Sequence, residues 1–214
     1  TKGVVVTHRN KRKYLGTWKR MMQRPKLEDY SCQEPREGYL FHLSTLWQSD
    51  EWNRNDEGVN YRRALYIRAC KLLGDEVLFE GGLVTSRTDE SVNQFKDCLV
   101  KRLTAKECLR KTKESAFVFN TPAYWDCHGW KLGEYMALGK AILSTRLSND
   151  LPAPLVEGKH IHYVDVYSQA DMMDSIRLLL NDRKYRNYLE KNIHDYWCSY
   201  GTPRASLELM GITK

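Results

Sequence analysis

Short apolar runs alternate with longer helix-forming segments along most of this chain, and this alternation restricts the fold more than any other feature. The runs have the length and composition of buried strands and lie at residues 39–43, 77–79, 116–119, 141–144 and 161–164. The segments between them place apolar residues at helical spacing. Strands that alternate with helices are typical of a parallel α/β fold, so we predict a parallel sheet flanked by helices.

Capping residues mark where some of these helices begin and end. Gly74 suits the position after a helix that ends near Leu73. Ser168, with an acid three residues later, predicts a capping box for a helix through residue 180. Asp182 is expected to cap a final helix that reaches about Tyr200. Residues 91–103 form an amphipathic stretch, and a basic stretch follows it.

Size and composition favour one soluble domain with additional segments. The chain has 214 residues, of which 42% are hydrophobic and 29% charged, as in folded soluble proteins. No apolar run approaches the roughly 18 residues that span a bilayer. The apolar run at the N-terminus is too short for a signal peptide, so we expect a cytoplasmic protein.

The net charge of +7 comes from one end of the chain. Residues 1–26 hold nine of the 34 lysines and arginines and no acid, so the other residues carry 25 bases against 27 acids. A basic arm on a nearly neutral body attracts anionic partners such as membrane headgroups, RNA or an acidic protein surface. A solvated connecting segment is the alternative interpretation.

Several functional classes find no support in the sequence. The six cysteines form no C-x-x-C pair and no cluster with zinc-ligand spacing, so no metal site is expected. The G-x-G-x-x-G and G-x-x-x-x-G-K-[ST] patterns are absent, which argues against dinucleotide oxidoreductases and P-loop NTPases.

Residues 115–144 form the most informative stretch, because they divide into strand, loop, helix and strand. Ligands of parallel sheets bind at the carboxyl ends of the strands, where the start of this helix is expected to lie. A helix N-terminus favours phosphate, and Lys131 in the first turn adds a full charge. Glu134, one turn further in, suits the hydroxyls of a ribose, while Asp126 precedes the helix in the loop.

The same stretch resembles the C-terminal half of GT-B glycosyltransferases. The resemblance rests on the helix sequence Glu-Tyr-Met-Ala-Leu-Gly-Lys-Ala-Ile-Leu from Glu134 and on the later Pro-Leu-Val-Glu-Gly from Pro154. It covers about residues 39–200. It implies a Rossmann-like domain, one half of a GT-B architecture, that binds a nucleotide-diphosphate sugar and needs no metal cofactor. The segment from Arg186 to Pro203 resembles the terminal helix that crosses back to the partner domain.

Site residues follow from the resemblance one by one. Glu134 matches the second acid of the family's E-x7-E pattern and is expected to bind the ribose. Asp126 takes the position of the first acid, which contacts the transferred sugar, and the aspartate is a departure from the usual glutamate. Lys131 is expected to hold the diphosphate. His128 and Gly129 are expected to line the same loop, with His128 beside Asp126 as a catalytic candidate.

Five further residues are interpreted from the sequence alone. Gly81 and Gly82 are expected to make a tight turn after the second strand, where Gly82 allows the nucleotide to approach the backbone. His42 is expected to be a core histidine. Arg62 and Arg63 are expected to lie on the solvated face of an early helix, with contact to phosphate as the alternative.

The predicted function is therefore a glycosyltransferase donor domain that transfers a sugar to a glycan or lipid-linked acceptor in polysaccharide biosynthesis. We expect residues 1–38 to be a basic arm, linker or remnant of a missing N-terminal domain, residues 39–200 the donor domain and residues 201–214 a tail. The arm suits peripheral membrane contact, and nucleic acid is not the expected partner. A non-catalytic nucleotide-binding or interaction module whose arm docks on a polyanion remains the alternative.

Overall fold

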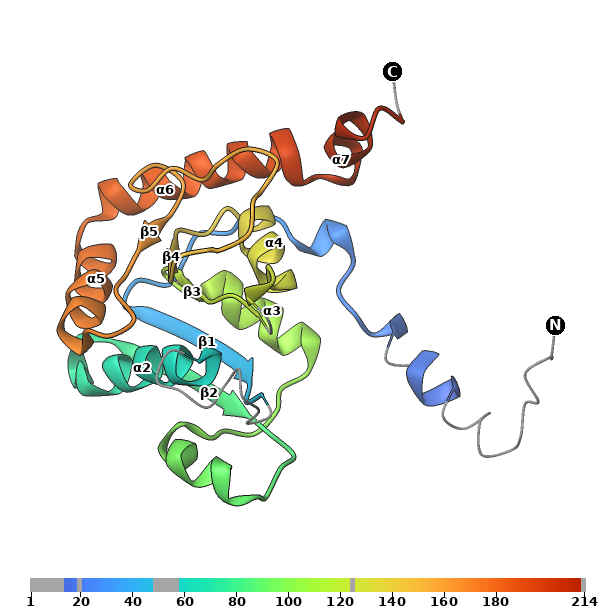
Figure 1. The fold of residues 1–214 in the computed structure, drawn as a ribbon. Helices are drawn as coiled ribbons and strands as arrows, with labels where there is room; N and C mark the ends of the chain where they lie inside the picture. Colours follow the sequence, from blue (N-terminus) through green and yellow to red (C-terminus); the bar gives the residue numbers. More distant parts are fainter. Residues whose placement is uncertain (1–13, 19–20, 48–57, 124–125, 213–214) are drawn as a thin grey trace.

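The fold is built on parallel strands, as the alternating pattern predicts. The computed structural model describes residues 14–18, 21–47, 58–123 and 126–212. Parallel pairing joins β1 (Tyr39–Thr45) to β2 (Leu78–Val84), and it joins β3 (Val118–Asn120), β4 (Ile142–Ser144) and β5 (His162–Tyr163) in that order. The two sets adjoin where the Ala116 amide donates to the Tyr39 carbonyl over 2.7 Å. The strands therefore follow the order β2-β1-β3-β4-β5 (Figure 1).

Helices connect and cover these strands. They are α2 (Val59–Leu72), α3 (Ala105–Glu114), α4 (Trp130–Ala137), α5 (Gln169–Asn181), α6 (Arg183–Tyr196) and α7 (Pro203–Leu209). Short 3-10 segments span Leu27–Asp29, Gly74–Glu76 and Glu90–Cys98, and a π-helical turn spans Trp197–Gly201. The α/β class with parallel strands is confirmed.

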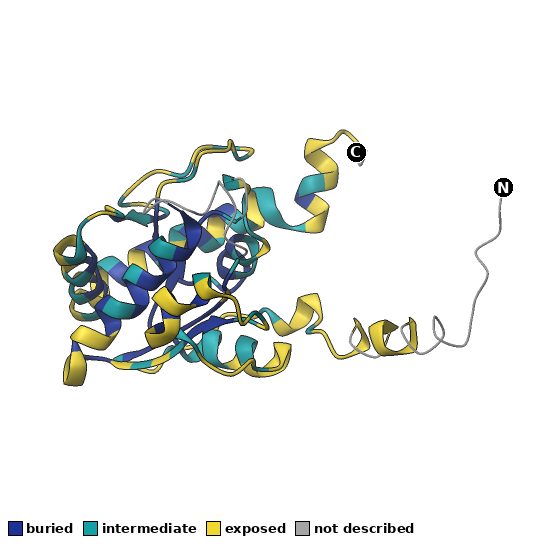
Figure 2. Cartoon of the chain, turned by 60° about the horizontal axis from the view of Figure 1, so that its bottom comes forward, coloured by how far each residue is buried: buried dark blue, intermediate teal, exposed yellow. Residues whose placement is uncertain are grey.

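Each central strand buries both of its faces, in different clusters. Leu40, Phe119 and Leu143 pack with buried residues of α2 and α5. The residues next to them in the sequence point to the other face, where Val118 and Ile142 pack with α4 and α6. The period of two is that of a strand with opposite side chains on opposite faces. Helices therefore cover the sheet on both sides, and the buried strands form the dark centre of Figure 2.

Local signals set the helix boundaries. The Ser168 hydroxyl accepts from the Asp171 amide over 3.0 Å, and the Asp182 carboxylate accepts from the Tyr185 amide over 2.9 Å, which confirms both as N-cap residues. The amphipathic stretch at 91–103 contains the 3-10 segment Glu90–Cys98 rather than an α-helix. The α-helix begins only after Thr104, which makes a reciprocal capping box with Glu107.

The prediction of a turn at Gly81 and Gly82 is wrong, because β2 continues through both residues to Val84. A Cβ at Gly81 would lie 1.8 Å from the His42 carbonyl oxygen, and one at Gly82 would lie 2.3 Å from the Cys98 carbonyl oxygen. The two glycines are required by close backbone approach inside the fold.

Both ends of the chain extend from this body. The described residues before Leu27 project away from the sheet and are mostly exposed (Figures 1 and 2). At the other end, residues 201–214, expected to be a tail, contain α7. Among the described residues, no helix is both long enough and apolar enough to cross a membrane.

Candidate functional site

Polar residues gather where β1, β3 and β4 end. Ser44, Asn120, Thr121, Ser144 and Thr145 are all buried there. The Asn120 amide donates to the Ser144 hydroxyl over 3.0 Å, which joins two strand ends. In the order β2-β1-β3-β4-β5 the chain adds β2 on one side of β1 and the later strands on the other, so the strand order reverses between β1 and β3. Ligands of open α/β sheets bind at such a switch point.

Lys131 enters this region from α4. Its ammonium donates to the carbonyl oxygen of Leu43, near the end of β1. Burial, and then the positive charge of Arg63, lower the pKa of Lys131 to about 8. Lys131 is thus held at the strand end, in surroundings that favour an added negative charge.

Arg63 enters the same region from α2, on the opposite side of the sheet. Its Nε donates to the Thr121 hydroxyl over 3.0 Å, and its Nη1 donates to the Thr45 carbonyl over 2.9 Å. Burial lowers its pKa to about 10. The prediction of a solvated Arg63 is wrong. The residue shares the buried face of α2 with Val59 and Ile67, and their spacing of four is the signal that would have placed it inside.

The loop before α4 is held by backbone and ionic contacts. Asp126 has a positive φ of 53°, and its carbonyl accepts from the side chains of Ser148 and Asn149 over 3.2 and 3.3 Å. Its carboxylate lies 3.5 Å from the guanidinium of Arg62. Arg62 is therefore half-buried and paired rather than solvated, and Asp126 lies next to a cation at the edge of the site.

His128 and Gly129 complete the loop. The His128 Nε2 lies 3.3 Å from the carbonyl oxygen of Asp150, while its buried Nδ1 has no partner among the described residues. Gly129 is the N-cap of α4 and provides no side-chain cap. The amide groups of the first turn of α4 are thereby left to other acceptors.

Glu134 lies one turn into α4, on the same side of the helix as Lys131. The hydroxyl of Tyr30, from the segment before β1, donates to its Oε1. Burial raises the pKa of Glu134, and the hydrogen bond from Tyr30 opposes that shift. Tyr30 has no signal in the sequence, because nothing local in residues 27–38 indicates a contact 104 residues away.

Gly82 lies apart from this constellation. It sits inside β2, where the backbone of Cys98 and the side chain of Val100 would meet any Cβ. His42 is buried on β1 as expected and bonds the Ser44 hydroxyl over 2.8 Å. Roles in binding or catalysis for all six site candidates stay predictions: Gly82, Asp126, His128, Gly129, Lys131 and Glu134.

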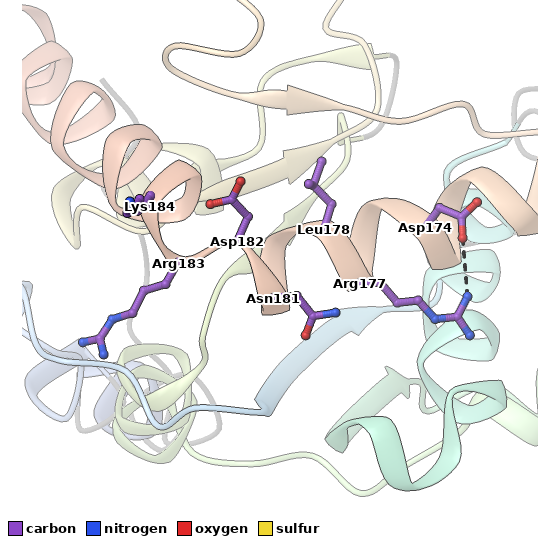
Figure 3. Close-up of a pocket in the computed structure, with 7 residues that line it drawn as sticks. All are labelled: Asp174, Arg177, Leu178, Asn181, Asp182, Arg183 and Lys184. Carbon is purple, nitrogen blue, oxygen red and sulfur yellow. Dashed lines mark hydrogen bonds and ion pairs between the residues drawn. The ribbon is translucent and has the colours of Figure 1, made fainter.

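A separate hollow of about 640 Å³ lies at the junction of α5 and α6 (Figure 3). Its charged residues are mostly neutralised by neighbours: Arg177 lies 2.8 Å from Glu76 and 3.4 Å from Asp174. Residues 174–184 line it, none of which lies at a strand end. We therefore do not place the functional site there.

Within the described part of the chain, no group of three or more His, Cys, Asp or Glu side chains is placed to hold a metal ion. The convergent groups are instead two cations, an uncapped helix N-terminus and one carboxylate. Such a set can bind an anion with hydroxyl groups attached to it.

Comparisons with known proteins identify the fold. No protein-family model and no curated protein matches the sequence. Solved structures do match. The C-terminal domain of a glycosyl transferase group 1 family protein from Francisella tularensis is 13% identical with a TM-score of 0.53, over 84% of this chain and 99% of that one.

Two larger proteins match in the same way. Sucrose-phosphate synthase from Thermosynechococcus elongatus is 14% identical with a TM-score of 0.57, over 87% of this chain and 49% of that one. HepE from Anabaena, in complex with UDP and glucose, is 9% identical with a TM-score of 0.53, over 89% of this chain and 55% of that one. This chain spans about half the length of these two proteins. Its fold is that of the Rossmann-like C-terminal domains of GT-B glycosyltransferases.

Proposed function

We propose that this chain is the donor-binding domain of a glycosyltransferase and binds a nucleotide-diphosphate sugar. The observation that carries the proposal is the convergence of Lys131 and Arg63, from opposite sides of the sheet, on the end of β1 beside the start of α4. Both side chains are cations in a low-dielectric environment, and within the described part of the chain neither forms an ion pair with a carboxylate. A diphosphate would supply the missing negative charge.

Glu134 supports the nucleotide part of the proposal. A carboxylate one turn into the helix accepts hydrogen bonds from the two hydroxyls of a ribose whose diphosphate lies at the helix N-terminus. Asp126 and His128, in the loop before α4, are proposed to contact the transferred sugar. Gly129 leaves the helix amides open, and Gly82 is retained only as a more distant candidate for backbone approach.

The chemistry of these residues suits the departure of a nucleoside diphosphate. In glycosyl transfer the acceptor oxygen bonds to the anomeric carbon, and the bond from that carbon to the diphosphate breaks with its electron pair on the diphosphate. Lys131, Arg63 and the α4 amides would stabilise the charge that develops there. The group that takes the acceptor proton is proposed to lie in a partner domain, since this chain matches about half of the larger proteins.

The wider context is proposed on the same grounds. We assign the chain to sugar transfer onto a glycan or lipid-linked acceptor, in cytoplasmic polysaccharide biosynthesis, without a metal cofactor. UDP is the first nucleotide to test, because the solved structures of HepE hold UDP with glucose or UDP-glucose.

Calorimetric titration with UDP, GDP, ADP, CDP and dTDP tests the proposal, on the wild-type chain and on Glu134→Gln. One nucleotide should bind, and the variant should bind it about 10- to 150-fold more weakly, the loss expected for a hydrogen bond to a charged group. Glu90→Gln, an exposed acid in the 3-10 segment after β2, is the matched control. Equal affinities in both variants would remove Glu134 from the site.

The N-terminal arm favours a second role, contact with an anionic membrane. Its described apolar residues are exposed: Tyr14, Leu15, Trp18, Met21, Met22 and Leu27. The arm also carries nine bases and no acid up to residue 26, and each base near anionic lipid contributes about 1 kcal/mol. Vesicles with phosphatidylserine should therefore sediment the protein in low salt, and pure phosphatidylcholine vesicles should not. A protein that binds such polyanions but no nucleotide would be the non-catalytic module.

A further inference from the structure

Tyr30 is an unusual residue in its segment. Tyr30 is half-buried, whereas all the other residues from 26 to 34 are exposed. It reaches the body of the protein through its hydroxyl, which donates to the carboxylate of Glu134. This carboxylate is the group that we assign to the ribose.

The other attachments of this segment follow Tyr30 in the sequence, from Ser31 to Glu37. The Ser31 hydroxyl accepts from Lys113 over 3.1 Å, the Arg36 amide donates to the Glu114 carbonyl over 2.8 Å, and Glu37 forms a bidentate pair with Arg186 at 2.7 and 2.8 Å. On the N-terminal side, the described arm projects away from the body (Figure 2). Residues 27–38, which we term the strap, are therefore anchored at one end and hold Tyr30 near the other.

Tyr30 adds little to the packing of the protein. In the described part of the chain it belongs to none of the four clusters of buried apolar residues. Leaving its position would thus break one charge-assisted hydrogen bond and uncover part of one ring, without opening the core. Such a contact is weak enough for a ligand to displace.

The hydroxyl of Tyr30 uses Glu134 in the way that a ribose hydroxyl would. It presents an O–H donor to one oxygen of a carboxylate that burial has deprived of water. A ribose diol needs the same oxygen. Tyrosine and ribose therefore compete for one acceptor oxygen.

We propose that Tyr30 closes the ribose subsite and that nucleotide binding must displace it, so that the strap is a built-in gate. This inference rests on the proposed function of Glu134. A protein whose binding-competent state is populated to about a tenth binds its ligand about tenfold more weakly than the open state does. Removing the tyrosine should recover that factor.

The experiment compares the wild-type chain, Tyr30→Phe, Tyr30→Ala and the control Tyr188→Phe by titration with UDP and the other nucleoside diphosphates. Tyr188 is a half-exposed tyrosine on α6. Tyr30→Phe loses only the donor, and Tyr30→Ala also loses the ring. Both Tyr30 variants should bind nucleotide about tenfold more tightly than the wild type, and Tyr188→Phe should match the wild type.

Hydrogen exchange provides a second readout. If the gate exists, nucleotide should speed amide exchange in residues 28–33 of the wild type, although ligands normally slow exchange near their site. Tyr30 variants that bind as weakly as the wild type or more weakly would overturn the gate and leave the proposed function intact. If no nucleotide binds any of the four proteins, the proposed function fails and the gate fails with it.

Discussion

At the scale of single residues, the site is defined by the environment of Lys131. Its ammonium is buried beside Arg63, and both effects hold its pKa at about 8. A bound diphosphate would favour the charged form and raise that pKa. Below about pH 8 the lysine is already charged, so nucleotide affinity should be constant there. Above about pH 8 the lysine is mostly neutral, so Lys131 must take up a proton when the nucleotide binds.

The affinity for nucleotide should therefore fall as the pH rises from about 8 to 10, by up to tenfold per unit. Lys131→Gln should bind weakly and show no such decline. Calorimetry at several pH values checks this, and an unchanged wild-type affinity between pH 7 and 9.5 would contradict it.

At the scale of residues, a sequence predicts position where the pattern is local. The places of Lys131 and Glu134 in the first turns of α4 follow from their distance to the start of the helix, while their roles stay predictions. The burial of Arg63 runs against the usual exposure of arginine, and only its helical spacing with Val59 and Ile67 indicates it. Tyr30 was out of reach, since its only signal is a contact formed after folding.

At the scale of elements, β2 depends on its two glycines. Alanine at Gly81, with φ of 123° and a Cβ 1.8 Å from the His42 carbonyl oxygen, should lower the free energy of unfolding by at least about 3 kcal/mol. Positive-φ strain and overpacking each cost about 1 to 3 kcal/mol.

Gly133→Ala is the matched control in α4. Its Cβ would lie 3.8 Å from the Trp197 ring, an ordinary contact, so it should stabilise the protein by about 0.5 to 1 kcal/mol. Denaturant titration measures both variants. A Gly81→Ala protein as stable as the wild type would mean that β1 and β2 do not approach as described.

Elements were predictable to the extent that their residues specify them locally. The five strands and the start of α4 follow from apolar runs and loop composition. The extent of β2 did not, because a Gly-Gly pair is equally typical of a turn and of close strand contact. Only the position of β1 and Cys98 next to β2 decides between the two.

At the scale of the whole molecule, the ion pair of a buried arginine ties the N-terminal segment to the last third of the chain. Arg186 is fully buried, and its guanidinium binds both carboxylate oxygens of Glu37 and the carbonyls of Leu179 and Leu180. Glu37→Gln would leave the buried charge unpaired, and we expect it to lower the free energy of unfolding by about 2 kcal/mol.

Glu34→Gln is the control for that variant. Glu34 lies 3.8 Å from Arg183, and both side chains are exposed, so its loss should change stability by less than about 0.5 kcal/mol. Thermal and denaturant unfolding compare the two. Equal stabilities would show that Glu37 does not anchor the strap.

The basic arm and Tyr30, which contacts Glu134, are only a few residues apart in the sequence. Tyr30 follows the basic arm directly, since Lys26 is the last of its nine cations. A surface that draws the arm away from the body would also draw Tyr30 from Glu134. Linkage is reciprocal, so nucleotide in the opened subsite would raise the affinity of the arm for that surface by the same factor. The fraction of the protein bound to that surface would then rise with the concentration of nucleotide.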